Sequence, residues 1–122
     1  KVRAFPQPKQ FKGPIAVLVS GGTGSAAEMI SAGLRDTVGA RVFGQKSIGM
    51  VLASVVTPLD SMSLPREQRT GFQMIVPLQD YITAKGLRLE GSGVVPDVVT
   101  KPDTNPNTDT TLEEALKWIA KK

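Results

Sequence analysis

Apolar and polar residues follow two different patterns within residues 15–38, separated by a glycine-rich stretch at 20–24. Residues 15–19 form a continuous apolar run, which is typical of a β-strand buried on both faces. From Ser25 onward, apolar residues recur every three or four positions, which predicts a helix to about Val38 with Gly39 as its C-terminal stop. The apolar stripe of this helix should consist of Ala26, Met29, Ile30, Gly33 and Leu34.

The chain after this helix predicts short extended segments joined by turns. Strands are expected at 41–44, 51–57 and 72–76, a hairpin formed by 81–83 and 87–89, a turn at 91–93 and an extended piece at 94–99. Residues 59–70 should form a surface loop. Pro77 should end the strand before it, because proline cannot donate to a strand ladder. A strand, a helix and a second strand with short links imply a parallel crossover.

The two ends of the chain differ from the middle. Residues 1–13 are rich in Lys, Pro and Gln, which predicts an entering segment. Residues 14–101 should form the main body. Residues 102–122 should contain a linker and then a helix from about Thr111, where Thr111 and Glu114 have capping-box spacing. This helix should dock on the body through Leu112, Ala115, Leu116 and Ile119, with Trp118 beside them. The fold class is therefore α/β, with a mixed sheet, one crossover helix and a C-terminal helix.

Composition narrows the function classes. The 122 residues suffice for one domain at most, and the net charge of +4 is scattered, which indicates a solvated surface. Nucleic-acid binding is disfavoured because the few aromatic residues are not interleaved with the charges. No apolar run reaches membrane-spanning length. The absence of cysteine excludes thiol chemistry, and the absence of histidine means that no Ser-His pair can be completed within the chain.

The glycine turn before the first helix could hold a dinucleotide. Residues 22–27 satisfy the pattern G-x-G-x-x-A between a strand and a helix. An acidic residue that would bind the ribose should then fall near positions 44–46, where Gln45 and Lys46 stand instead. A Walker A loop is excluded because no Gly-Lys-Ser/Thr follows the turn. This pattern alone is a weak basis for a nucleotide site.

The same turn could also present a nucleophilic serine. Ser25 would lie at a helix N-terminus, and the N–H of Ala26 would point toward an oxyanion formed on a carbonyl group that Ser25 attacks. The sequence does not match G-x-S-x-G, the usual elbow of serine hydrolases. Ser25 and Glu28 also have capping-box spacing, and these residues by themselves favour a purely structural N-cap.

Three segments resemble motifs of the C-terminal processing (tail-specific) serine peptidases. Residues 19–28, VSGGTGSAAE, resemble the motif that carries the nucleophile, residues 41–49 resemble the next strand and its turn, and residues 86–98 resemble the closing segment. The resemblance implies that Ser25 is the nucleophile and that the fold is the α/β spiral shared with the crotonase and Clp-type peptidase folds. It implies an incomplete domain, with residues 14–101 as the C-terminal part of a serine peptidase catalytic domain. It also implies a polypeptide substrate, no metal or other cofactor, and an extracytoplasmic location.

The sequence departs from this family at one important position. The usual base is a lysine directly after Gly49, where this chain has Met50. Lys46 lies four residues earlier, where a surface role is expected. A tricorn-like branch uses Ser, His and Glu, and the resemblance to it implies that Glu90 orients a histidine supplied from outside this chain. Gly24, Gly49 and Met50 should contact substrate, whereas Asp36 and Asp97 should have structural roles.

Two further function hypotheses stay open beside the serine peptidase. One is a catalytically inactive, peptide-binding member of the same fold, which Met50 favours. The other is the dinucleotide-binding βα unit. The expected partners are a polypeptide substrate and the N-terminal remainder of the same protein, and a homo-oligomer is left open.

Overall fold

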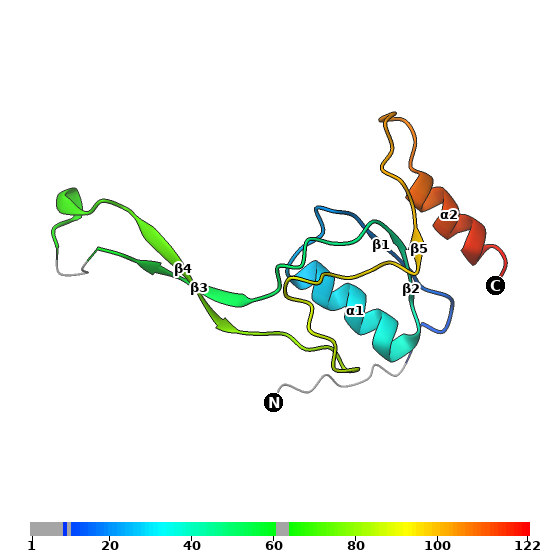
Figure 1. Ribbon diagram of the computed structural model, residues 1–122, viewed down its shortest axis with the longest axis horizontal. Coiled ribbons are helices and arrows are strands. Elements are labelled where there is room, and N and C mark those ends of the chain that lie inside the picture. The colour runs from blue at the N-terminus through cyan, green and yellow to red at the C-terminus, as the bar shows by residue number, and fades with distance from the viewer. Residues whose placement is uncertain (1–8, 10, 61–63) are drawn as a thin grey trace.

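A computed structural model describes residues 9, 11–60 and 64–122 of the chain. The entering segment predicted for residues 1–13 lies largely outside these ranges. The elements are β1 (Ala16–Val19), α1 (Ala26–Val38), β2 (Arg41–Gly44), β3 (Ala53–Pro58), a short 3-10 helix η1 (Arg66–Gln68), β4 (Gln73–Gln79), β5 (Val98–Val99) and α2 (Thr110–Ile119). Figure 1 shows a compact body with both α-helices, from which β3 and β4 extend as a long arm.

The body contains a three-stranded parallel sheet in the order β1-β2-β5. β1 pairs with β2 from Ala16↔Arg41 to Val19↔Gly44, and α1 connects the two strands, so the predicted parallel crossover is confirmed. Gly44 is required at the end of β2, because a Cβ atom there would lie 1.9 Å from the carbonyl oxygen of Val19. The prediction that β1 is buried on both faces is wrong, since β1 is at the edge of the described sheet and Leu18 is 46% exposed.

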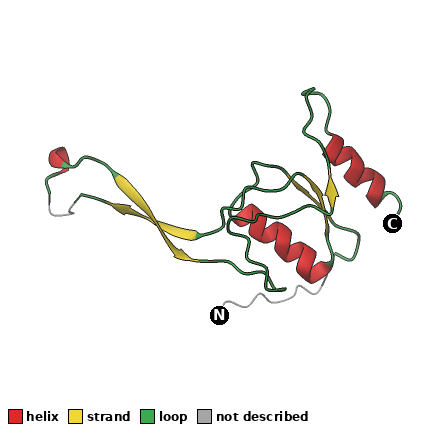
Figure 2. Cartoon of the chain, viewed as in Figure 1, coloured by secondary structure: helices red, strands yellow, loops and turns green. Residues whose placement is uncertain are grey.

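The arm is a separate antiparallel sheet formed by β3 and β4 (Figure 2). The predicted single mixed sheet is therefore wrong, although the α/β class is confirmed. The prediction that Pro77 ends its strand is also wrong: β4 continues to Gln79, and Pro77 pairs with Ser54 beside a register shift at Ala53/Ser54. A proline is tolerated in this position because a two-stranded ribbon has only edge strands and because the register shift interrupts the ladder.

Helix α1 has the predicted bounds but not the predicted buried face. Gly39 adopts the left-handed conformation, with φ 70°, that commonly ends a helix. The fully buried positions are Glu28, Ser31 and Ala32, whereas Ile30 in the predicted stripe is 62% exposed. The helix is rotated relative to the predicted orientation because Glu28 faces the interior, where its carboxylate is hydrogen-bonded.

Helix α2 packs against β1 and β2, as predicted, but through a different face. Trp118 contacts Phe43 with ring centroids 5.7 Å apart, and the hydroxyl groups of Thr111 and Thr100 are hydrogen-bonded at 2.6 Å. The predicted stripe is wrong except for Ala115; its other members, Leu112, Leu116 and Ile119, are exposed. The predicted capping box is wrong as well, because Asp109 caps the helix by accepting from the N–H of Leu112.

The hydrophobic core lies between α1, the sheet and the segment that follows the arm. It consists of Val19, Ala32, Val42, Val51, Leu89 and Val94. Residues 81–89 fold back on themselves through a single antiparallel bridge, Ile82↔Arg88, so the predicted hairpin is present only as a tight turn. No helix in the described ranges is long and apolar enough to cross a membrane.

Candidate active site

Ser25 occupies a strained position at the start of α1. Its backbone angles are φ 55° and ψ −128°, and it is the one non-glycine residue with positive φ in the part of the chain that the structure describes. A side chain in this conformation destabilises the fold by about 1–3 kcal/mol, and such residues cluster at functional sites. The turn before it is held by hydrogen bonds from the Thr23 N–H to the Ser20 carbonyl at 3.0 Å and from the Ser20 N–H to the Thr23 hydroxyl at 2.9 Å.

The first backbone N–H groups of α1 are not equivalent. Those of Ala27, Glu28 and Met29 donate to carbonyl oxygens of Gly24 or Ser25 at 3.0–3.2 Å. The N–H of Ala26 has no hydrogen-bond partner among the described residues. Within the described residues, the amide that follows the exposed Ser25 is therefore unpaired, and its use as an oxyanion-hole donor stays a prediction.

Glu28 is a fully buried carboxylate with four hydrogen-bond donors. Its Oε1 accepts from the Ser47 hydroxyl at 2.5 Å and from the Gly49 N–H at 2.7 Å. Its Oε2 accepts from the N–H groups of Met50 at 3.0 Å and Ser25 at 3.1 Å, so the glutamate half of the predicted capping box is confirmed. Burial raises the pKa of the Glu28 carboxyl, but the four hydrogen bonds outweigh burial and hold its pKa below the usual range.

Ser47 joins this carboxylate to a distant part of the chain. Its hydroxyl donates to Glu28 and accepts from the N–H of Val94 at 2.6 Å, and its own N–H donates to the Val94 carbonyl at 3.1 Å. Nearby, the Gly91 N–H donates to the Gly49 carbonyl at 2.8 Å. The turn at 47–50 is thus fixed between α1 and the closing segment.

Glu90 lies on that closing segment, half-buried, and lines the same cavity as Ser25. Its Oε2 accepts from the N–H of Val51 at 2.8 Å. In the part of the chain described, its Oε1 has no hydrogen-bond partner. The structure therefore brings the two predicted catalytic side chains to one cavity, although 65 positions separate them in the sequence.

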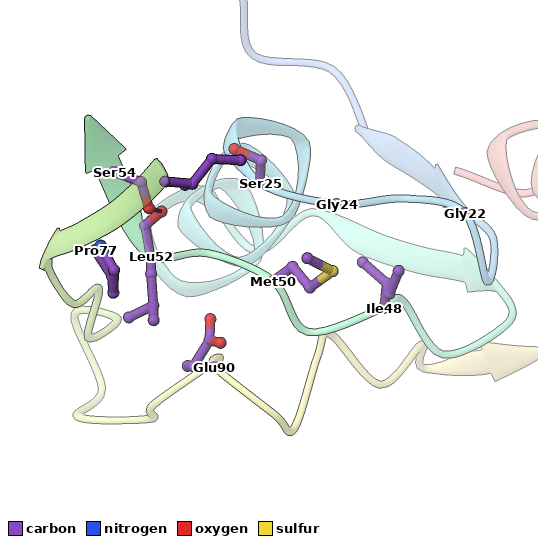
Figure 3. Close-up of a pocket in the computed structure, with 10 residues that line it drawn as sticks. Gly22, Gly24, Ser25, Ile48, Met50, Leu52, Ser54, Pro77 and Glu90 are labelled. Carbon is purple, nitrogen blue, oxygen red and sulfur yellow. Dashed lines mark hydrogen bonds between the residues drawn. The ribbon is translucent and has the colours of Figure 1, made fainter. Parts of the chain in front are cut away.

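The cavity has a volume of about 520 Å³ and lies between the body and the base of the arm. Its lining comprises Gly22, Gly24, Ser25, Ile48, Met50, Leu52, Ser54, Ile75, Pro77 and Glu90. In the view of Figure 3, Ser25 and Glu90 lie on either side of Met50 and Leu52. Of the predicted substrate contacts, Gly24 and Met50 line the cavity, whereas Gly49 is buried behind it and bonded to Glu28.

The remaining candidates lie away from the cavity. Lys46 is exposed and is not part of the lining. Asp36 lies within 4 Å of Arg35 and Lys85 at the end of α1. Asp97 accepts from the Val42 N–H at 2.8 Å and so fixes the closing segment to β2. These contacts agree with the structural roles expected for both aspartates.

Sequence reasoning did not identify the arm as a wall of the site. Leu52, Ser54 and Ile75 come from residues that the pattern assigns only to short strands, and Pro77 was expected to end one of them. The role of Glu28 beyond a helix cap was also missed. A glutamate among apolar helix positions was the available signal, since a carboxylate on a buried face needs several donors.

Comparison with known proteins adds independent information. The family model described as Peptidase family S41 matches residues 2–100. A carboxy-terminal-processing protease of Bartonella bacilliformis is 30% identical over 105 residues, which is 84% of this chain and 22% of that protein. A chloroplastic C-terminal processing peptidase of Tetradesmus obliquus is 30% identical over 93 residues, 76% of this chain and 18% of that protein. The chain thus spans about a fifth of the length of these relatives.

Solved structures show the same relationship. The photosystem II D1 C-terminal processing protease is 28% identical, with a TM-score of 0.59 over 87% of this chain and 24% of that one. Mature CPAF complexed with lactacystin is 22% identical, with a TM-score of 0.66 over 95% of this chain and 21% of that one, and shows likeness of fold alone.

Proposed function

The chain belongs to peptidase family S41, and from this premise we propose that it is part of the catalytic domain of a serine-type peptidase that hydrolyses peptide bonds in polypeptides. The observation that carries the proposal is Ser25: a strained, exposed serine that lines a cavity with Glu90 and is followed by a helix amide with no partner among the described residues. The crotonase-type spiral predicted from the sequence is part of this proposal.

In the proposed reaction, Ser25 Oγ attacks the carbonyl carbon of the scissile bond while its proton passes to a general base. The carbonyl oxygen becomes an oxyanion and accepts the N–H of Ala26, which has no competing partner in the described ranges. The tetrahedral intermediate then collapses to an acyl-enzyme as the amine leaves with the proton from the base. Water releases the acyl group by the same steps in reverse order.

The base must come from outside these 122 residues. Met50 stands where the lysine of the related peptidases is expected, and the sequence contains no histidine. We assign the role to a histidine elsewhere in the full-length protein. Glu90 would orient that ring, because it lines the cavity and its Oε2 accepts from the Val51 N–H, while its Oε1 has no hydrogen-bond partner among the described residues.

The substrate is proposed to be an extended polypeptide segment that enters by its C-terminus. The names of the relatives refer to C-terminal processing. Five apolar side chains line the cavity and suit an apolar substrate side chain: Ile48, Met50, Leu52, Ile75 and Pro77. Extracytoplasmic placement is part of the same proposal.

Met50 favours one alternative function, an inactive peptide-binding member of the family, because a thioether cannot accept the proton of Ser25. One experiment separates the two functions. The full-length protein is assayed for peptide hydrolysis and for labelling by a fluorophosphonate, beside Ser25→Ala and a control, Ser31→Ala, which removes a hydroxyl buried in the same helix. The peptidase predicts hydrolysis and labelling that only Ser25→Ala abolishes.

The binder predicts neither hydrolysis nor labelling in any of the three proteins. Equal activity in wild type and Ser25→Ala would show that Ser25 is not the nucleophile. The isolated 122-residue chain should not be labelled, since its base is missing. Labelling at Ser25 in that chain would contradict the assignment of an external base.

A further inference from the structure

We propose that Glu28 is a positioning residue for the reaction: its buried carboxylate fixes residues 47–51, and this segment sets the places of Ser25 and Glu90 in the cavity. The inference rests on the proposed function, because it takes Ser25 and Glu90 as the groups that act on substrate. Glu28 itself does not line the cavity.

The Glu28 carboxylate is surrounded by hydrogen-bond donors and is not part of an ion pair among the described residues. Its side chain is 0% exposed, and none of the salt bridges within the described ranges includes it. Burial of a carboxylate without a cation is unfavourable unless hydrogen bonds replace its water, and here four do so.

Met50 connects the Glu28 carboxylate to the backbone of Ser25. Its N–H donates to Glu28 at 3.0 Å, and its carbonyl oxygen accepts from the Ser25 N–H at 2.8 Å. Because Glu28 also accepts from the Ser25 N–H, the three residues form a closed set of contacts around the strained turn. A shift of Met50 would therefore move the serine that the turn presents.

Val51, the residue after Met50, connects the same segment to Glu90. Its N–H donates to the Glu90 carboxylate at 2.8 Å. Ser47 closes the network from the other side, since its hydroxyl links Glu28 to Val94 on the segment that carries Glu90. The spacing between nucleophile and orienting carboxylate thus depends on one buried side chain that belongs to neither.

The test uses the full-length protein and two variants that cut the network at different atoms, Glu28→Gln and Ser47→Ala. Glutamine retains the volume but replaces one acceptor oxygen with a donor that faces N–H groups. Ser31→Ala is the matched control, because its hydroxyl is equally buried but bonds to the Ala27 carbonyl within α1 at 2.6 Å. The readouts are kcat, the rate of fluorophosphonate labelling of Ser25, and Tm.

We expect Glu28→Gln and Ser47→Ala to lower kcat and the labelling rate about 10- to 100-fold, because misplacement by about 1 Å has effects of this size. Ser31→Ala should keep the wild-type rates. Its Tm should fall less than that of Ser47→Ala, because its hydroxyl bonds only to a carbonyl within α1 while that of Ser47 satisfies a buried carboxylate. The combined Glu28→Gln/Ser47→Ala variant should be little worse than either single variant, since the two changes break one network.

Wild-type rates in folded Ser47→Ala would overturn the inference, and so would unfolding of both single variants at the assay temperature, which would make the network purely structural. If Glu28→Gln alone fails to fold, Ser47→Ala decides the matter. Failure of the proposed function is a different result: wild type itself would then not be labelled, or Ser25→Ala would keep its activity.

Discussion

Glu28 and Glu90 bind consecutive main-chain N–H groups of one segment: that of Met50 donates to Glu28 at 3.0 Å, and that of Val51 donates to Glu90 at 2.8 Å. Only Glu90 reaches the cavity. We therefore expect the two carboxylates to have separable roles: Glu28 should hold the segment, and Glu90 should contact the groups that react.

Glu90→Gln should lower kcat of the full-length protein about 100- to 10,000-fold, because an amide can keep the Val51 bond but cannot stabilise an imidazolium ion. Glu114→Gln is the control, since that carboxylate lies on α2 and pairs with Lys117. Steady-state kinetics on a peptide substrate measures both. A Glu90→Gln protein with wild-type kcat would show that Glu90 does not orient the base.

The strain at Ser25 predicts an opposed effect on stability and activity. Ser25→Gly should abolish hydrolysis and should be more stable than Ser25→Ala by about 1 kcal/mol, because glycine adopts φ 55° without a steric cost. Thermal unfolding of the two inactive variants, compared at the same pH, measures the difference. A lower Tm for the glycine variant would mean that the backbone angle is not a source of strain.

The hydrogen bonds to Glu28 predict acid-dependent stability. Because the folded-state pKa lies below the unfolded value of 4.5, ionised Glu28 stabilises the fold above pH 4.5, and this contribution is lost as pH falls through the lower folded pKa. Glu28→Gln should therefore flatten the decrease of Tm below pH 4.5. The exposed Glu67→Gln is the control, and an unchanged pH profile in Glu28→Gln would contradict the assignment.

Local pattern was sufficient for the first third of the fold. The apolar run, the glycine turn and the helix gave β1, α1 and β2 nearly to the residue, because strand and helix periods and the Gly39 stop act over short distances. The buried face of α1 was not predictable in this way. Its rotation depends on donors from residues 47–50, which meet Glu28 only in the folded chain.

The site was predictable where it depends on motifs and not where it depends on tertiary contacts. Ser25 and Glu90 were identified by resemblance, and the structure brings them to one cavity. Ile75 and Pro77 were missed because their place depends on the pairing of β3 with β4 and on the continuation of β4 through proline. No local signal specifies where such an arm folds back.

The wall that the arm contributes predicts an effect on substrate binding. Ile75 is 70% exposed and lines the cavity, so Ile75→Asp should leave folding intact and place a charge where an apolar substrate side chain is expected. We expect KM to rise about 10-fold or more with little change in Tm, because an unpaired carboxylate disfavours an apolar neighbour. Peptides with an apolar and with a basic residue at the varied position would measure the effect.

Met74→Asp is the matched control for this prediction. Met74 precedes Ile75 on β4 and is 48% exposed. Neighbouring residues of a strand face opposite sides, and Met74 is not among the residues that line the cavity. It should therefore keep the wild-type KM. The basic peptide should lose less than the apolar one in Ile75→Asp, because the new carboxylate can pair with it. Equal KM values in wild type, Ile75→Asp and Met74→Asp would mean that substrate does not reach the arm, and the cavity would then bind only the residues nearest Ser25.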